Sequence, residues 1–126
     1  MVRSRRSAKD AGTRFERSIA DYLKRVLGSD IDRRVKHGSK DTGDISGVFF
    51  RGKRVVIEAK DYRGRHKLPE WLREAEIERL NDDASYGVVC WKRMGTAKPD
   101  EQYVTMTLGT FAAMLAGGPE LLEGGE

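Results

Sequence analysis

The sequence has one cysteine and no long apolar run, and each scarcity excludes a class of protein. The single thiol, Cys90, cannot form an intramolecular disulfide, and its place in an apolar stretch favours a buried thiol in a reducing compartment. No run approaches the ~20 apolar residues of a membrane helix, and no apolar stretch of signal-peptide kind follows the basic first residues. We therefore expect a soluble intracellular protein with no membrane partner.

The residues needed for a zinc site are also missing. His37 and His66 are not spaced as a zinc pair, and one cysteine cannot complete the ligand set. Trp71 and Trp91 each lie in an apolar-periodic stretch and not in a basic aromatic cluster. We expect these two tryptophans in the core or at a dimer interface, and not as platforms for base stacking.

Charge is unevenly distributed along the chain. The first nine residues contain no acidic side chain, while the last ten combine glutamates with four glycines and a proline. The chain has 126 residues, 35% of them charged and 38% apolar, which suits one compact domain with a modest core. The sequence predicts a flexible basic arm at 1–11 of the kind that binds nucleic acid, a folded domain at 12–116 and a disordered acidic tail at 117–126.

The order of apolar patterns predicts a mixed sheet flanked by helices. Apolar residues at helical spacing between Phe15 and Leu27 predict a first helix, with Thr13 as its cap and Gly28 at its end. The remaining elements are an edge strand at 31–35, a loop at 37–43, a hairpin at 45–60, a helix opened by Pro69, strands at 86–91 and 103–107, and a short helix at 111–115. This order gives an α/β or α+β sandwich.

The hairpin decides whether three charged residues meet. An odd-length loop, Arg51-Gly52-Lys53, would place Ser46 opposite Glu58 and Asp44 opposite Lys60, so that Asp44, Glu58 and Lys60 share one face. A two-residue loop, Gly52-Lys53, would send Asp44 to the other face. The charged site therefore requires the odd loop or a bulge, and the sequence leaves the register open.

These residue types suit phosphodiester chemistry. Two carboxylates, Asp44 and Glu58, can bind a hard cation such as Mg²⁺, and the main-chain carbonyl of Ala59 can add an uncharged ligand. The ammonium group of Lys60 could orient a metal-bound water or neutralise charge on the phosphate. Each motif taken alone is weak, since Glu-x-Lys also occurs in solvated strands and an Asp after Gly is usually a turn residue.

Four segments in a fixed order resemble the PD-(D/E)xK nuclease superfamily, and specifically its archaeal-type Holliday junction resolvases. The resemblance covers residues 12–116 and implies a restriction-endonuclease-like core. It is carried by Gly12-Thr13-Arg14-Phe15-Glu16, Gly38-Ser39-Lys40, Gly43-Asp44-Ile45 and Glu58-Ala59-Lys60. The departure is Gly43, where the superfamily name has proline.

The resemblance implies a role for each matching residue. Glu16 from the first helix joins Asp44, Glu58 and Lys60 in the metal site, although its position among other helix charges would otherwise suggest a solvated side chain. Ser39 would contact the scissile phosphate or its neighbour, whereas a loop-capping serine is the structural alternative.

Basic residues flank this candidate site on both sides in the sequence. We expect them to contact the phosphate backbone, with binding that weakens as salt rises, although a solvated surface is equally compatible with any one of them. Lys92, Arg93 and Lys98 form a third basic loop with less positional support. The expected contacts are Arg33, Arg34, Lys36, Lys40, Arg63, Arg65 and Lys67.

The sequence thus favours a divalent-metal-dependent endonuclease that resolves four-way DNA junctions by paired nicks. The expected cofactor is Mg²⁺, with Mn²⁺ as a substitute and no small-molecule cofactor. The resemblance implies a homodimer in the cytoplasm or nucleoid of a prokaryotic cell, with a viral origin equally open. Two alternatives remain: a nuclease for flap, modified or linear duplex DNA, and a non-catalytic DNA-binding or architectural module.

Overall fold

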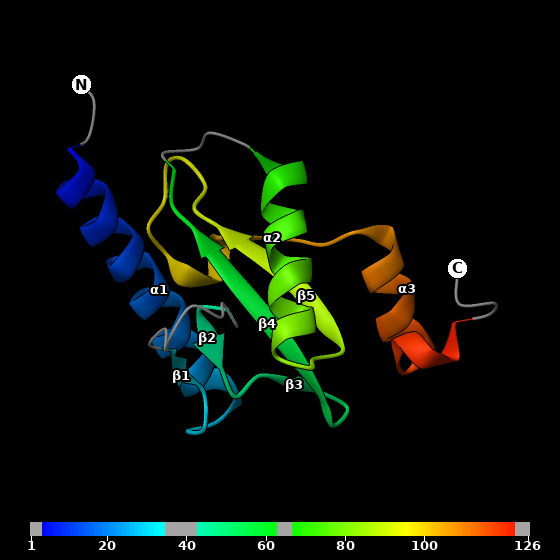
Figure 1. Ribbon diagram of the computed structural model, residues 1–126. Helices are drawn as coiled ribbons and strands as arrows, with labels where there is room; N and C mark the ends of the chain where they lie inside the picture. Colours follow the sequence, from blue (N-terminus) through cyan, green and yellow to red (C-terminus); the bar gives the residue numbers. More distant parts are fainter. Residues whose placement is uncertain (1–3, 35–42, 63–66, 123–126) are drawn as a thin grey trace.

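The computed structural model describes residues 4–34, 43–62 and 67–122. Within these residues, six strands form a mixed sheet and three α-helices accompany it (Figure 1). The elements are α1 (Arg5–Leu27), β1 (Asp32–Arg33), β2 (Ile45–Ser46), β3 (Phe49–Phe50), β4 (Lys53–Lys60), α2 (Leu68–Asn81), β5 (Tyr86–Trp91), β6 (Tyr103–Thr105) and α3 (Leu108–Ala116), with 3-10 turns at Pro99–Glu101 and Pro119–Leu121.

The sheet is mixed because one of its pairs is parallel. Its order is β1-β2-β4-β5-β6, and β3 pairs with β4 beside this path. Strands β4 and β5 run parallel and are joined through helix α2, whereas the other pairs are antiparallel. The predicted α/β mixed sheet is confirmed at this level.

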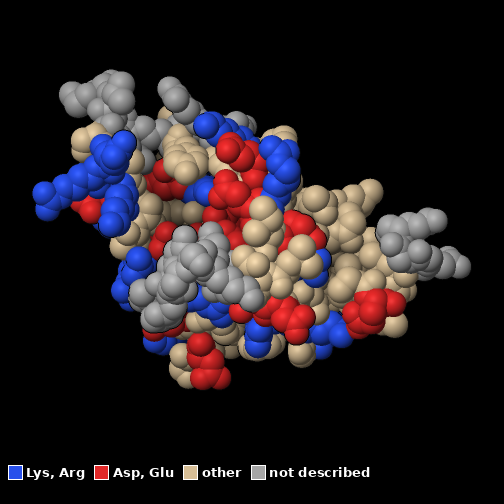
Figure 2. Space-filling view, in the orientation of Figure 1, with Lys and Arg blue, Asp and Glu red and all other residues tan. Residues whose placement is uncertain are grey.

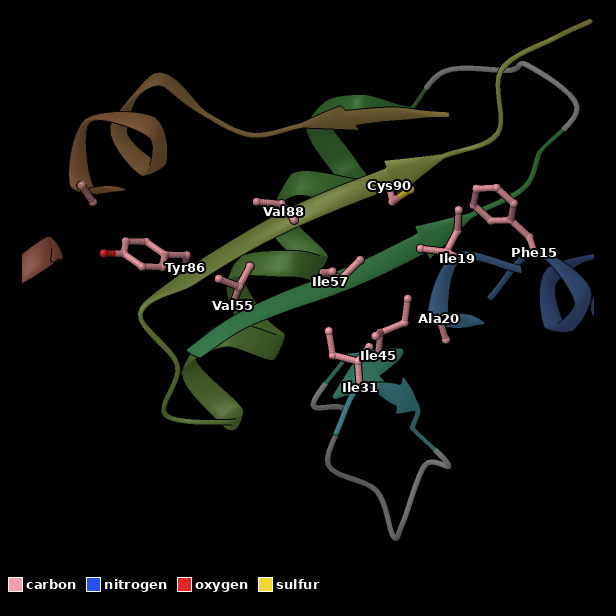
Figure 3. Packing of buried hydrophobic residues seen from close by; sticks show 11 residues of the cluster. Phe15, Ile19, Ala20, Ile31, Ile45, Val55, Ile57, Tyr86, Val88 and Cys90 are labelled. Carbon is pink, nitrogen blue, oxygen red and sulfur yellow. The ribbon is translucent and has the colours of Figure 1, made fainter. Parts of the chain in front are cut away.

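The two faces of β4 pack against different helices. Val55 and Ile57 belong to a cluster that also contains Phe15 and Ile19 of α1 and Ala113 of α3 (Figure 3). On the other face, Trp71 and Ala75 of α2 pack against Val89 and Trp91 of β5, the strand beside β4. Successive residues of a strand alternate between faces, so Val56, Glu58 and Lys60 lie on the face that α2 covers.

The first helix begins earlier than the sequence predicted. Ser4 caps α1 by accepting a hydrogen bond from the N–H of Ser7 at 3.0 Å, and the helix runs through Thr13, the expected cap. Residues 5–11 of the predicted flexible arm at 1–11 are helical. Residues 1–3 lie outside the described residues. Arginine, alanine and lysine favour helix, so a short polar stretch preceded by a capping serine continues the amphipathic helix.

The start of the predicted acidic tail also has a defined place. Gly117 ends α3 in the left-handed conformation, at φ 97°, and a 3-10 turn follows at Pro119–Leu121. Glu120 in this turn accepts a hydrogen bond from the Lys53 ammonium group at 2.6 Å, which ties the turn to β4. Residues 117–122 therefore differ from the disorder expected for 117–126, while 123–126 lie outside the described residues.

The hairpin turn is neither of the two that the sequence offered. Phe50 pairs with Lys53, so the loop is the two-residue Arg51-Gly52, with positive φ at both positions as in a type I′ turn. Further along, Ile45 pairs with Ile57, which leaves one extra residue on the first strand between this pair and the turn. This extra residue is a β-bulge, which shifts the register by one residue and so places Asp44 on the same face as Glu58.

Several smaller expectations hold with shifted bounds. Of the predicted edge strand at 31–35, Asp32–Arg33 is a strand, and residue 35 lies outside the described residues. The strand predicted at 103–107 ends at Thr105 because Thr107 caps α3. Trp71 and Trp91 are buried in the core, as is Cys90, whose burial raises the pKa of its thiol to about 12. Among the described residues, no helix is long and apolar enough to cross a membrane.

Candidate metal and nucleic-acid site

Asp44 is held beside β4 by its backbone and its side chain. Its N–H donates to the carbonyl of Ile57 at 3.0 Å, and its carboxylate accepts a hydrogen bond from the N–H of Ala59 at 2.8 Å. The bulge therefore brings Asp44 next to Glu58 and not opposite Lys60, as the odd loop would have done. The predicted neighbourhood of Asp44 and Glu58 is present, but it arises from a different register.

The residue before Asp44 is Gly43, whose backbone conformation proline could not adopt. Its φ of +96° is inaccessible to proline, whose ring fixes φ near −65°. A Cβ added at Gly43 would also lie 2.7 Å from Cγ1 of Val56. The turn into Asp44 thus requires glycine for two independent reasons.

Glu58 is buried among other acidic groups. Only 5% of the residue is exposed, and this burial raises the pKa of its carboxyl group to about 8, with the charge of Glu78 acting in the same direction. The side chain of Asp44 and the charge of Lys60 oppose that rise. Oε1 of Glu58 is buried and has no hydrogen-bond partner within the described part of the chain. A buried carboxylate oxygen of this kind is suited to a cation.

Lys60 is the last residue of β4, and its side chain reaches helix α2. Its ammonium nitrogen is 3.1 Å from Oε2 of Glu58 and 2.7 Å from Oε2 of Glu74, and only 11% of its side chain is exposed. Burial lowers the pKa of Lys60, but the hydrogen bond with Glu74 and the charge of Glu58 outweigh burial and raise this pKa above its ordinary value. Lys60 is therefore a cation at neutral pH and cannot serve as a base.

Glu16 reaches the same region from helix α1. Burial and the charge of Asp44 raise the pKa of its carboxyl group, against the lowering influence of Arg33 and Lys60. Its Oε1 accepts a hydrogen bond from Nε of Arg33 at 2.9 Å, and 20% of its side chain is exposed. Glu16 thus lies within electrostatic reach of Asp44 and Lys60 and is not a fully solvated helix charge.

The predicted DNA-contacting residues differ in their surroundings. Arg33 is paired with Glu16, and Arg34 is paired with Asp82 at 3.1 Å, so acidic partners compensate both charges. Lys67 is exposed at the start of α2. The DNA-binding role of these three residues and the ligand role of the Ala59 carbonyl stay predictions. Four predicted contacts and the candidate catalytic serine lie outside the described residues: Lys36, Ser39, Lys40, Arg63 and Arg65.

Helix α2 contributes two glutamates that the sequence analysis did not single out. Oxygen atoms of Glu74, Glu78 and Glu58 all lie within 4.8 Å of one another. Glu78 is 1% exposed and continues the buried stripe of Trp71 and Ala75. The sequence contained one signal for these residues, since Glu78 is a charged residue at a helical position where the pattern requires an apolar one. Glu74 lies four positions earlier on the same side of the helix.

The arrangement of charge is visible on the molecular surface. Figure 2 shows acidic side chains gathered in the hollow between α1 and α2, with Lys and Arg side chains around it. Carboxylate oxygens are the ligands that hard divalent cations prefer, and the described group contains several of them with one buried lysine. The oxygen donors of Glu58, Glu74 and Glu78 are of the chemical type that Mg²⁺ or Mn²⁺ binds.

Comparisons with known proteins add no relative of this chain. No family model matches the sequence, and no curated protein or solved structure is similar to it at the level required of a match. The function must therefore be inferred from the residues and their geometry.

Proposed function

We propose that this protein is a divalent-metal-dependent DNA endonuclease of the PD-(D/E)xK type. One observation carries the proposal: Asp44 and Glu58 lie side by side on the hairpin, Lys60 is 3.1 Å from Glu58, and the charges of Asp44 and Lys60 act on the pKa of Glu16 from the distant helix α1. These are the four residues that the resemblance assigns to the metal site. The hairpin alone brings Asp44, Glu58 and Lys60 together, so the approach of Glu16 from α1 is the part that a chance match of short motifs would not explain.

Three carboxylates would hold the cation. Glu58 offers a buried oxygen without a hydrogen-bond donor, Asp44 lies beside it, and Glu16 approaches from α1. A bound Mg²⁺ would lower the pKa of a coordinated water and neutralise negative charge on a phosphate. The carboxylates also keep other anions out of the hollow until a cation reduces their charge.

Lys60 would act on the substrate as a fixed positive charge. Its ammonium group has three N–H donors, and Glu58 and Glu74 account for two of them. A phosphate oxygen can accept the third and so place its phosphorus close to the metal ligands. Stabilisation of the charge that develops on the phosphate follows from this position.

The substrate class that we propose is a four-way DNA junction, cut by paired nicks. Symmetric cutting of two strands requires two active sites, and we therefore propose a homodimer. Apolar side chains on α3 are available for a contact between subunits, since Leu108 is 80% exposed and Leu115 is 70% exposed.

The test is a cleavage assay on a synthetic four-way junction beside a linear duplex with the same arms. With Mg²⁺ we expect symmetrically paired nicks in the junction and an intact duplex. Equal cutting of the duplex would retain the nuclease chemistry and reject the junction as the substrate class. Tight binding without any cutting in Mg²⁺ or Mn²⁺ would reject the enzyme and favour an architectural DNA-binding module.

A further inference from the structure

Glu74 makes the shorter of the two contacts to the Lys60 ammonium group. The separation is 2.7 Å to Glu74 and 3.1 Å to Glu58. The two carboxylates come from different elements, Glu58 from β4 and Glu74 from α2. The Lys60 ammonium group is thus held by one carboxylate of the sheet and one of helix α2, and α2 contains none of the four motifs that carry the family resemblance.

The two carboxylates that contact Lys60 have different proposed roles. Glu58 is one of the proposed metal ligands, so a divalent cation would compete with Lys60 for its negative charge. Glu74 pairs with Lys60 through Oε2 and is not one of the three carboxylates proposed to hold the cation, so a cation bound by those three would leave its contact with the lysine in place. Without that partner, the flexible four-carbon chain of lysine would regain rotamer freedom.

The element that carries Glu74 is rigidly placed. Trp71 and Ala75, on either side of Glu74 in the sequence, are each 1% exposed and pack against β5. The backbone of Glu74 is therefore held in place, and its carboxylate can hold the lysine in one position. We propose that Glu74 is a positioning residue, which fixes the Lys60 ammonium group at the place where the substrate phosphate would bind. This inference rests on the proposed function.

The test compares Glu74→Ala and Glu74→Gln with the matched control Glu76→Ala. Glu76 lies two positions further along α2 and pairs with Arg79 at 2.6 Å, so its removal deletes a carboxylate without touching Lys60. Single-turnover cleavage of the junction with Mg²⁺ gives the rate at saturating DNA and the DNA concentration for half-maximal rate. Calorimetric titration with Mn²⁺ gives the metal affinity.

For Glu74→Ala we expect the saturating rate to fall on the order of 10²-fold, as for a misplaced reacting group, with unchanged DNA and Mn²⁺ affinity. Glu74→Gln keeps a hydrogen-bond acceptor and should recover part of the rate. The ¹⁵Nζ resonance of Lys60 should shift in Glu74→Ala and stay in place in Glu76→Ala. These results would support the inference.

Equal rates for Glu74→Ala and Glu76→Ala, or an unshifted Lys60 resonance, would overturn the positioning role while leaving a cutting wild type intact. A loss of Mn²⁺ affinity in Glu74→Ala would also overturn it, because Glu74 would then be a metal ligand. A wild type that cuts no DNA would instead overturn the proposed function, and the inference with it.

Discussion

The two faces of strand β4 differ in chemistry, since one is mainly apolar and the other carries charged side chains. Val55 and Ile57 point into an apolar cluster built with α1 and α3. Val56 points to the opposite face, where Glu58 and Lys60 follow it under helix α2. Both faces are largely buried, yet one holds hydrocarbon and the other holds carboxylates and an ammonium group.

The difference indicates where folding free energy is gained and where it is lost. Burial of apolar side chains on the α1 face stabilises the domain by roughly 25 cal/mol per Å². Burial of Glu58 beside Glu78 opposes folding unless a proton or a cation compensates the charge. In the proposed function the second arrangement serves metal binding, and the strand tolerates it because Val55, Ile57 and Ala59 on the first face are apolar.

The largest expected effect comes from the charged face. Glu58→Gln removes a proposed metal ligand and Lys60→Ala removes the ammonium group proposed to bind the phosphate, so each should lower junction cleavage by at least about 10²- to 10³-fold. Junction binding should remain largely intact, because neither side chain carries most of the backbone contacts. Single-turnover cleavage and an electrophoretic mobility shift measure the two quantities. Near-wild-type cleavage by either variant would refute the site assignment.

The apolar face should respond in stability and not in chemistry. Ile57→Ala leaves a cavity beside Ile45 and Val88 and should lower the free energy of unfolding by about 2 to 5 kcal/mol, measured by urea denaturation. Its control, Ile57→Val, should cost about 0.5 to 1.5 kcal/mol. The folded fraction of either variant should cut at the wild-type rate. A cleavage defect that exceeds the loss of folded protein would contradict the claim that the apolar face contributes only to stability.

A smaller effect should appear as a pH dependence of stability in metal-free buffer. The pKa of Glu58 is raised from 4.5 to about 8, so the folded state holds this proton where the unfolded chain has lost it. The contribution of Glu58 to stability is complete below pH 4.5 and is lost as pH rises towards 8. Urea denaturation between these pH values should show a steeper decline for wild type than for Glu58→Gln. Parallel curves would contradict a buried, raised-pKa carboxylate.

The sequence predicted the elements well because their patterns are local. The helix at Phe15–Leu27, the hairpin and the buried strand at 86–91 follow from apolar periodicity and turn residues, and all are present. The hairpin register could not be predicted in this way. It depends on an extra residue before Phe49, where Gly47 at φ 84° packs closely against the backbone of Asp30.

The candidate site was predictable only in part, for a related reason. Asp44, Glu58 and Lys60 are close in sequence and share a hairpin, whereas Glu16 entered through the family resemblance. The contacts of Glu74 with Lys60 and of Arg33 with Glu16 depend on how helices pack on the sheet, which no local pattern encodes. The early start of α1 was missed because Ser4 precedes a stretch without apolar periodicity.

The most direct measurement is a calorimetric titration of metal-free protein with Mn²⁺, beside the Glu58→Gln variant. The account predicts that wild type binds Mn²⁺ and that Glu58→Gln binds it at least ten-fold more weakly, about 1.4 kcal/mol of binding free energy. Wild type that binds no Mn²⁺, or a variant that binds it as tightly as wild type, would contradict a metal site on the charged face of β4.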